Sequence, residues 1–299
     1  MVDLVILGTI GIDTLETPQG KAENVLGGSA TYASFAASFF CKPGIVSIVG
    51  EDFPKEHEEL LKSRNICMLG VDKKGKTFRW HGRYEDINEA KTLKTELNVL
   101  LEFEGKVPAE YQDARFIFLG NLDPELQLKV LGQIKNPRLI VMDTMNHWID
   151  SKKEKLLEVI KKANVLLIND GEAKLLFNTN NLVKAAKQAL QLGPHTVIIK
   201  KGEHGALMFT KGNSHFNAPA YPVENVKDPT GCGDSFGGSF TAYLAATDDI
   251  SEKNIRKALI YATSVASHNV EGFSLNNLKQ ITKQHIEERV NKLKEIREF

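Results

Sequence analysis

The residues best suited to chemistry lie in one segment, Asp228-Pro229-Thr230-Gly231-Cys232-Gly233-Asp234. Gly231 and Gly233 allow a tight turn whose backbone N–H groups can approach a bound group. The apolar residues that follow recur at helical spacing, so the turn is expected to begin a helix, and a helix N-terminus attracts anions. Asp234 stands where substrate charge would gather. That placement makes sense if Asp234 removes a proton from a hydroxyl while the amides hold the charge of a transferring group.

Other interpretations of this segment stay open. Asp234 could cap the helix while the glycines only shape a turn, and Asp228 is then the rival base. Thr230 could contact nucleotide phosphates or help Pro229 to shape the turn. Cys232 offers either a thiol made reactive by the helix N-terminus or a small residue that simply fits.

The segment resembles the C-terminal signature of the ribokinase-like, or phosphofructokinase-B, family of carbohydrate and nucleoside kinases. Three further segments resemble elements of that family in the family's order. Val25-Leu26-Gly27-Gly28-Ser29-Ala30-Thr31-Tyr32-Ala33 is similar to its N-terminal signature. Asn169-Asp170-Gly171-Glu172 is similar to its Asn-x-x-Glu element, and Lys201-Gly202-Glu203-His204-Gly205 to its Lys-x-Gly-x-x-Gly turn. The ordered set spans nearly the whole chain.

The resemblance implies an ATP-dependent kinase that transfers the γ-phosphoryl group to a hydroxyl of a sugar or ribonucleoside. Asp234 would be its base, and the amides of Gly231, Cys232 and Gly233 its anion hole. The implied nucleotide-binding residues are Asn169, Glu172, Lys201, Gly202, Gly205, Asp228, Thr230, Asn269 and Gly272. A monovalent cation is a further candidate cofactor beside ATP and Mg²⁺.

The pair Asn169 and Glu172 has two interpretations. Mg²⁺ prefers oxygen ligands and keeps several waters, so an amide and a carboxylate acting through water would suit Mg²⁺ on a triphosphate. An Asn followed three residues later by Glu is also the pattern of a capping box at a helix start. The match in family order favours the metal interpretation.

The implied substrate-binding residues are Asp13, Gly27, Gly28 and Tyr32. By resemblance Asp13 accepts hydrogen bonds from sugar hydroxyls, and an ionised carboxylate is a strong acceptor. The two glycines would let the backbone approach the sugar or hinge a lid. The family often has Asn where Tyr32 stands, and the helical phase that Tyr32 shares with Phe35 is equally typical of a core aromatic residue.

Short apolar runs rich in β-branched residues alternate with helix-patterned stretches, which is typical of a parallel sheet covered by helices. We expect a ribokinase-like three-layer α/β/α domain spanning 1–299, with a mainly parallel central sheet. The expected strands are Leu4–Leu7, Ile45–Val49, Phe116–Leu119, Leu139–Met142, Val165–Ile168, Val197–Ile199 and Ala206–Phe209. The expected C-terminal helices are Phe236–Ala246, Ile255–Val270 and Leu275–Ile296.

Residues 13–26 and about 66–103 interrupt this order with strand-like segments, for instance Thr77–Tyr84 and Leu97–Phe103. They predict a small separate sheet, which by resemblance is a lid over the substrate. Exposed strand edges would also allow this lid to pair with a second subunit in a homodimer. Aromatic lid residues would favour a nucleobase, whereas Arg79 and Arg83 would favour a sugar phosphate.

The composition excludes several classes of protein. Lys plus Arg and Asp plus Glu both number 38 among 299 residues, which argues against nucleic acid or an anionic membrane as the main partner. Three unpaired cysteines favour a cytoplasmic location. The first residues, Met1–Gly8, are typical of a core strand and not of a signal peptide.

Three other functions remain as alternatives: a sugar-phosphate kinase of the same fold, a non-catalytic nucleotide or sugar sensor, and a dinucleotide-dependent oxidoreductase. The intact Asp234 argues against a sensor, which needs no base. Gly8-Thr9-Ile10-Gly11 lacks the Gly-x-Gly-x-x-Gly fingerprint expected of the oxidoreductase.

Overall fold

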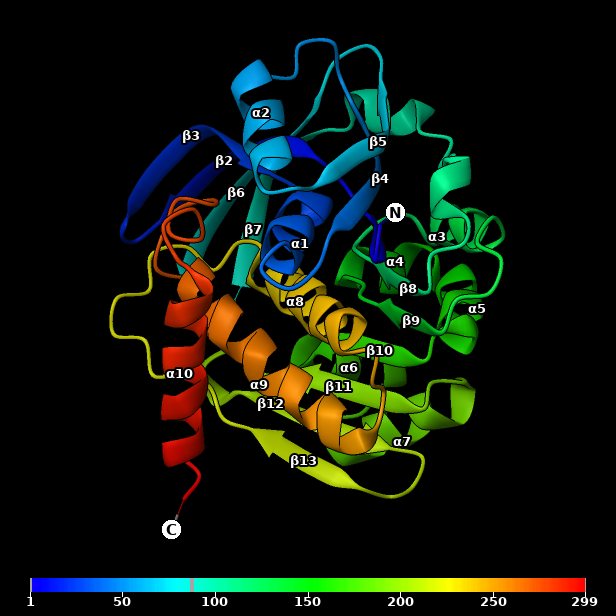
Figure 1. Cartoon of the computed structure of the whole chain (residues 1–299), viewed down its shortest axis with the longest axis vertical. Helices are drawn as coiled ribbons and strands as arrows, with labels where there is room; N and C mark the ends of the chain where they lie inside the picture. Colours follow the sequence, from blue (N-terminus) through cyan, green and yellow to red (C-terminus); the bar gives the residue numbers. More distant parts are fainter. Residues whose placement is uncertain (1, 87–88, 299) are drawn as a thin grey trace.

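The computed structural model describes residues 2–86 and 89–298 and contains two sheets. Within these residues the larger sheet has nine strands (Figure 1). In spatial order they are β13 (His215–Ala218), β12 (Ala206–Thr210), β11 (Thr196–Lys200), β10 (Val165–Asn169), β9 (Leu139–Met142), β8 (Phe116–Leu119), β1 (Leu4–Leu7), β4 (Pro43–Val49) and β5 (Cys67–Lys73). From β11 to β5 in this list, each strand is parallel to its neighbours. Strand β12 is antiparallel to both β11 and β13.

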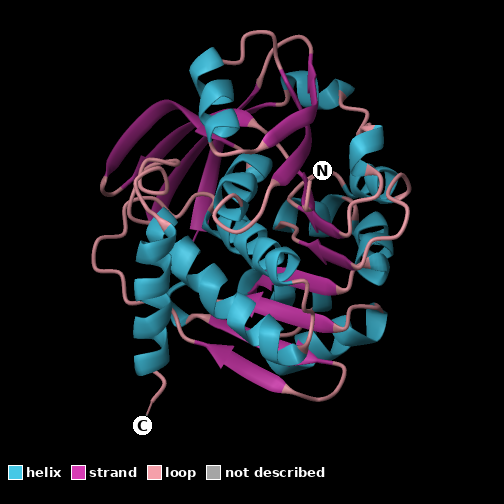
Figure 2. Ribbon diagram, in the orientation of Figure 1, coloured by secondary structure: helices cyan, strands magenta, loops and turns pink. Residues whose placement is uncertain are grey.

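Helices cover both faces of this sheet, as Figure 2 shows. Strand β1 alternates between two apolar clusters, with Leu4 and Ile6 in one and Val5 and Leu7 in the other. The first cluster includes α1 (Ser29–Ala37), α2 (Lys55–Ser63), α8 (Cys232–Thr247), α9 (Glu252–Asn269) and α10 (Lys283–Glu295). The second includes α3 (Pro124–Leu131), α4 (Asn146–Ser151), α5 (Lys153–Lys162), α6 (Asp170–Phe177) and α7 (Leu182–Leu192). The predicted three-layer α/β/α fold is confirmed.

The smaller sheet stands beside the main one and has the order β3 (Gly20–Gly27), β2 (Gly11–Thr17), β6 (Phe78–Asp86) and β7 (Glu89–Glu96). Strands β2 and β6 pair in parallel, and the two outer pairs are antiparallel. We call it the small sheet. None of the described helices is long and apolar enough to cross a membrane.

Some predicted elements differ from the structure. Leu97–Phe103 is not a strand, because a 3₁₀ helix spans Asn98–Glu102. Asn98 has φ +47°, which is not a strand conformation, and its side-chain amide donates to Thr77 O. The segment Cys67–Lys73 joins the main sheet beside β4. The last helix begins at Lys283, eight residues later than expected for Leu275–Ile296.

Candidate active site

The helix α8 begins at the Gly-rich turn, as predicted. Gly231 is its N-cap and has φ +73°, a left-handed conformation that favours glycine. A Cβ at Gly231 would also overlap the ring of Tyr32. The Cys232 N–H donates to Pro229 O at 3.2 Å, whereas the N–H groups of Gly231 and Gly233 have no acceptor among the described residues. Two free amides and the positive end of the helix dipole therefore remain for an anion.

Asp234 lies in the first turn of α8 and is partly exposed. Burial raises the pKa of this carboxyl to about 7, with a further rise from Asp143 and an opposing effect of Lys200. The charge of Asp234 in turn contributes to the raised pKa of Asp13. Asp234 is therefore close enough to Asp13 and to the Asp143–Lys200 pair to interact electrostatically with both. A base with a pKa near 7 is well matched to proton transfer at neutral pH.

Lys200 and Asp143 form a largely buried ion pair beside the turn. Asp143 follows β9 and Lys200 ends β11, so both lie at the carboxyl edge of the parallel strands, where α/β folds bind ligands. A Cβ at Gly233 would lie 3.1 Å from Lys200 Nζ and 3.9 Å from Asp143 Oδ2. The ammonium therefore stands next to the free amides at the start of α8.

Asn169 and Glu172 form the capping box of α6. Asn169 Oδ1 accepts from Glu172 N, and Glu172 Oε2 accepts from Asn169 N, both at 2.7 Å. Burial raises the pKa of Glu172 to about 7, against an opposing effect of Lys200 and with a further rise from Asp143. The capping interpretation is realised, and Glu172 Oε1 takes no part in the cap, so the metal interpretation stays a prediction.

Glu172→Gln separates these two roles. The amide can still accept from Asn169 N, so we expect the melting temperature to change little. If Glu172 acts on Mg²⁺ through water, loss of its charge should raise the Mg²⁺ concentration for half-maximal rate by roughly tenfold, within the 10–100-fold range of such outer contacts. A Mg²⁺ titration at saturating nucleotide measures this, and an unchanged titration curve would leave only the cap.

The other residues predicted to bind the nucleotide hold the backbone of the turn through hydrogen bonds. Asp228 is fully buried, and its Oδ1 and Oδ2 accept from Thr230 N at 2.9 Å and Ser274 N at 3.1 Å. Asn269 donates to Thr230 O at 2.9 Å and to Cys232 Sγ at 3.3 Å. Because both Asp228 oxygens are occupied and no solvent reaches them, Asp228 is a poor rival to Asp234 as base.

The Cys232 thiol is not activated. Burial raises its pKa to about 12, outweighing the hydrogen bond from Asn269. The thiolate that would make Cys232 reactive is therefore disfavoured, and the residue packs at the start of α8 as a small side chain. Gly272 lies against Asn277, where a Cβ would approach Asn277 N within 2.8 Å. The role of Gly272 at a nucleotide stays a prediction.

The turn of Lys201, Gly202 and Gly205 connects the antiparallel strands β11 and β12. Gly202 and Gly205 have φ +53° and +81°, and Lys201 N donates to Gly205 O at 2.8 Å. This is a glycine turn in its local geometry. The Lys-x-Gly spacing actually falls on Lys200, two positions before Gly202, and Lys200 is the lysine that enters the site.

The residues predicted on the substrate side meet around a buried carboxylate. Asp13 is 3% exposed, and its Oδ1 has no hydrogen-bond partner within the described chain. Burial, with Asp228 and against a hydrogen bond from Gly28, raises the pKa of Asp13 to about 8. Gly27 lies so close to Asp13 that a Cβ would overlap its carboxyl group, and Gly28 has φ +95° as the N-cap of α1.

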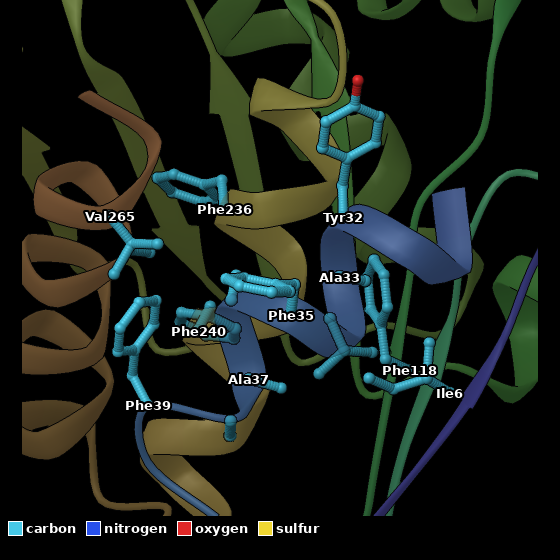
Figure 3. Close-up of a cluster of buried hydrophobic side chains, with 14 of the residues drawn as sticks. Ile6, Tyr32, Ala33, Phe35, Ala37, Phe39, Phe118, Phe236, Phe240 and Val265 are labelled. Carbon is cyan, nitrogen blue, oxygen red and sulfur yellow. The ribbon is translucent and has the colours of Figure 1, made fainter. Parts of the chain in front are cut away.

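Tyr32 has the buried ring expected of a core aromatic residue, and its role at the substrate stays a prediction. Its ring is buried against Gly231, but its hydroxyl points away from the labelled apolar cluster (Figure 3). That hydroxyl has no hydrogen-bond partner among the described residues and is affected electrostatically by Asp228, Asp13 and Tyr84. Asp13 Oδ1 and Tyr32 Oη are thus two buried polar atoms without a partner, and both could form hydrogen bonds with a hydroxyl-bearing ligand.

Sequence reasoning missed three residues of the site: Asp143, Lys200 and Tyr84. Tyr84 extends from β6 of the small sheet, and its hydroxyl lies 3.2 Å from Thr230 Oγ1. A polar residue after an apolar strand was a usable signal for Asp143 and Lys200, because neighbouring parallel strands end at one edge. No sequence signal joins Tyr84 to Thr230, which is 146 residues away.

The glycines of the turn provide a matched pair of variants. Gly231→Ala should lower both stability and turnover, because it forces a positive φ and a clash with Tyr32. Gly233→Ala needs no unusual backbone but places a methyl group beside Lys200, so we expect a larger loss of turnover than of melting temperature. Thermal denaturation and steady-state rates measure both. Equal losses in the two assays for Gly233→Ala would mean that Gly233 only serves packing.

Residues 3–281 match the pfkB family of carbohydrate kinases, and the chain belongs to this family. Kinases of the family are phosphotransferases that act on hydroxyl groups, and this protein is one of them. A cytidine kinase from Thermococcus kodakarensis is 32% identical over 249 residues, which cover 81% of this chain and 88% of the relative.

Solved structures share the fold. A nucleoside kinase from Burkholderia thailandensis, in complex with inosine, is 18% identical, with a TM-score of 0.81 and 97% of each chain covered. A candidate ribokinase II from E. coli, in complex with ATP and Mg²⁺, is also 18% identical, with a TM-score of 0.81, covering 98% of this chain and 100% of the other.

Proposed function

We propose that this protein is an ATP-dependent nucleoside kinase in which Asp234 removes the proton from the acceptor hydroxyl. The observation that carries this proposal is that Asp234 lies in the first turn of α8, next to the free amides of the Gly-rich turn, and interacts electrostatically with the unpaired buried carboxylate of Asp13. The similarity to a cytidine kinase over most of its length supports a nucleoside as the acceptor.

The residues present fit Mg²⁺ and ATP. An anion could bind at the free amides of Gly231 and Gly233 beside the Lys200 ammonium. A side chain at position 233 would reduce the space for that anion. The described residues contain no cluster of three or more His, Cys, Asp or Glu side chains that could hold a metal ion. That suits Mg²⁺ carried by the triphosphate and its waters, with Asn169 and Glu172 in outer contact.

The chemistry of the chain's own residues follows from this arrangement. Asp13 would accept hydrogen bonds from substrate hydroxyls and so hold the acceptor near Asp234. Asp234 would take the hydroxyl proton as the oxygen attacks, and the amides of Gly231 and Gly233 would hold the developing charge. Bound Mg-ATP supplies the phosphoryl group. Positioning and electrostatics would provide most of the acceleration.

The small sheet favours a nucleoside over a sugar phosphate. Strand β6 pairs regularly with β2, so Trp80 and Tyr84 lie on one face and Arg79 and Arg83 on the other. Tyr84 marks the first face as the one toward Thr230, and Asp13 lies directly beside Trp80 in the register. On the opposite face Arg83 is paired with Glu16 at 2.7 Å, and Arg79 donates to Asn24. This arrangement supports a substrate that meets the ring of Trp80, whose Nε1 donates to Thr92 on the neighbouring strand, because the arginines of the opposite face are paired within the small sheet.

A screen of ADP release with Mg-ATP tests the proposal. We expect cytidine or another nucleoside to exceed free ribose by about 5- to 150-fold in kcat/KM, because stacking of a base adds roughly 1–3 kcal/mol. Trp80→Ala should weaken nucleosides selectively, whereas Arg83→Ala, on the opposite face, is the matched control. Release with sugar phosphates alone would overturn the nucleoside assignment, and tight binding without release would indicate a sensor.

The kcat/KM of the protein should depend on pH through the raised pKa values of Asp234 and Asp13. Asp234 must be ionised to accept a proton, so kcat/KM should rise with pH through its pKa of about 7. Asp13 binds hydroxyls best as a carboxylate, which extends the rise to about 8. A pH profile measured with the best nucleoside checks this. A profile flat between these values would show that neither ionisation matters.

We further propose that the small sheet covers the acceptor site as a lid. The hydrogen bond between Tyr84 and Thr230 supports this by linking the sheet to the catalytic turn. Strands β3 and β7 form the edges of the sheet and could instead join a second subunit. Sedimentation of the protein across a range of concentrations tests this homodimer, and a monomer throughout would exclude it.

A further inference from the structure

A cavity lies where the end of α1, the end of α2 and the start of α10 meet. Its lining comes from three short segments, residues 38–39, 63–65 and 281–283. Its volume of about 410 Å³ falls within the range of roughly 300–1,000 Å³ that small-molecule pockets have. None of these residues belongs to the predicted nucleotide or substrate site, so the cavity is a separate feature of the molecule.

The lining of this cavity is positively charged. It contains Arg64 and Lys283, and the described residues that line it include no Asp or Glu. Neither cation forms an ion pair within residues 2–86 and 89–298, whereas Lys62 on the same helix as the cavity edge pairs with Glu58. Cations gathered without a carboxylate repel one another, and a bound anion would relieve that repulsion.

The guanidinium group of Arg64 is held on one side only. Its Cζ lies 5.0 Å from the ring centroid of Phe35 and 4.5 Å from that of Phe39. Its Nε donates to Ser38 Oγ at 3.3 Å, but its two NH₂ groups have no acceptor in the described part of the chain. Partial burial lowers the pKa of Arg64, and no described acidic group opposes this effect. A fixed guanidinium with free outer donors suits an oxyanion bound through two parallel hydrogen bonds.

The rest of the lining suits an organic group beside the oxyanion. Phe39 and Ile281 are buried apolar side chains that line the cavity. The side-chain amide of Asn65 lines it too and has no hydrogen-bond partner among the described residues. Because the volume is that of a pocket for an organic molecule, room remains beyond a single oxyanion.

The cavity and the proposed kinase site adjoin α1 at different places. Tyr32, near the start of α1, lies against Gly231 of the catalytic turn. Phe39 follows the other end of the helix, as Figure 3 shows. A ligand in the cavity is therefore distinct from a nucleotide or acceptor bound beside Asp234.

We propose that this cavity is a ligand site separate from the kinase site, which binds the phosphate group of a small phosphorylated organic molecule such as a sugar phosphate. Arg64 donates to two phosphate oxygens, and Lys283 neutralises the remaining charge. Phe39 and Ile281 contact the organic portion. A phosphate monoester carries about −1.5 to −2 charges at neutral pH, which matches the two cations of the lining.

Calorimetric titration with ribose 5-phosphate tests this site. We expect Arg64→Gln to weaken binding by about tenfold or more, because charge-assisted hydrogen bonds are lost. Lys62→Gln is the matched control: Lys62 lies in the last turn of α2 but outside the lining, so the affinity should stay within about twofold of wild type. An affinity that falls in Asp13→Asn but not in Arg64→Gln would place the ligand in the kinase site and overturn the proposal.

A second variant keeps the test independent of packing, because Arg64 covers two buried rings and its loss could lower stability. Lys283 is exposed at the first position of α10, so Lys283→Gln should keep the melting temperature. We expect it to weaken ribose 5-phosphate by about threefold, as for the loss of an exposed ionic contact. Unchanged affinity in this variant would contradict the proposal.

Inorganic phosphate shows which part of the ligand is recognised. It keeps the oxyanion but lacks the organic portion, so we expect it to bind about tenfold more weakly than ribose 5-phosphate, since less apolar surface is buried. Equal affinities would overturn the assignment of an organic ligand, and binding of neither compound would overturn the site. Because these titrations measure binding, their outcome does not depend on whether the protein releases ADP.

Discussion

Asp234→Asn is expected to lower kcat by roughly 10²-fold or more while the protein stays folded and binds nucleotide. The amide has nearly the shape of the carboxyl group but cannot accept a proton. Because burial raises the pKa of Asp234, replacement by a neutral residue also removes a partly buried charge. The melting temperature at pH 8 should therefore be equal to or higher than that of the wild type.

Steady-state ADP release and thermal denaturation measure the two effects of this change. Asp228→Asn serves as the control, because Asp228 lies six positions earlier and uses both oxygens as acceptors for Thr230 N and Ser274 N. It should lose stability, since an amide nitrogen cannot accept from a backbone N–H. Near wild-type turnover in Asp234→Asn would place the base elsewhere.

Much of the fold was predictable because its signals are local. The strands Leu4–Leu7, Phe116–Leu119 and Leu139–Met142 have the predicted limits, since each is a short apolar run in a sheet covered on both faces. The polar strand Glu89–Glu96 has no such run, and its Lys and Glu residues suit an edge strand. Alternation of apolar residues cannot reveal a strand that buries little.

Part of the site was predictable because its residues lie close together in the sequence. The glycines and Asp234 are adjacent in sequence, so their chemistry is visible in one segment. Lys200 and Asp143 meet across 57 residues, and their contact depends on the order of β9, β10 and β11 in the sheet. Spacing alone does not separate the two interpretations of Asn169 and Glu172, because the capping box and the metal interpretation use the same two residues.

Asp13→Asn should make the protein more stable but weaken its binding of the acceptor. The carboxyl of Asp13 is buried, and one oxygen has no partner, so its pKa rises from 3.8 to about 8. A raised folded-state pKa means that the folded protein retains a proton that the unfolded chain has lost. Stability is therefore lost progressively as the pH rises from about 4 to about 8, and it does not fall further above that.

An amide at position 13 avoids this cost because it carries no charge. We expect Asp13→Asn to unfold at a temperature a few degrees higher than wild type at pH 8, from a gain of about 1–3 kcal/mol. The difference should vanish near pH 4, where both side chains are neutral. Denaturation curves at several pH values test this, and a lower melting temperature at pH 8 would show that the carboxylate has a stabilising partner.

The cost in function should be large. Asn at position 13 offers one acceptor oxygen without charge, so hydroxyl groups of the acceptor lose a charge-assisted hydrogen bond. We expect KM for the nucleoside to rise by roughly 10-fold or more, with a smaller change in the KM for ATP. An equal rise in both would place Asp13 outside the acceptor site. A destabilising carboxylate in a buried position is retained, on this view, because the substrate supplies its missing partner.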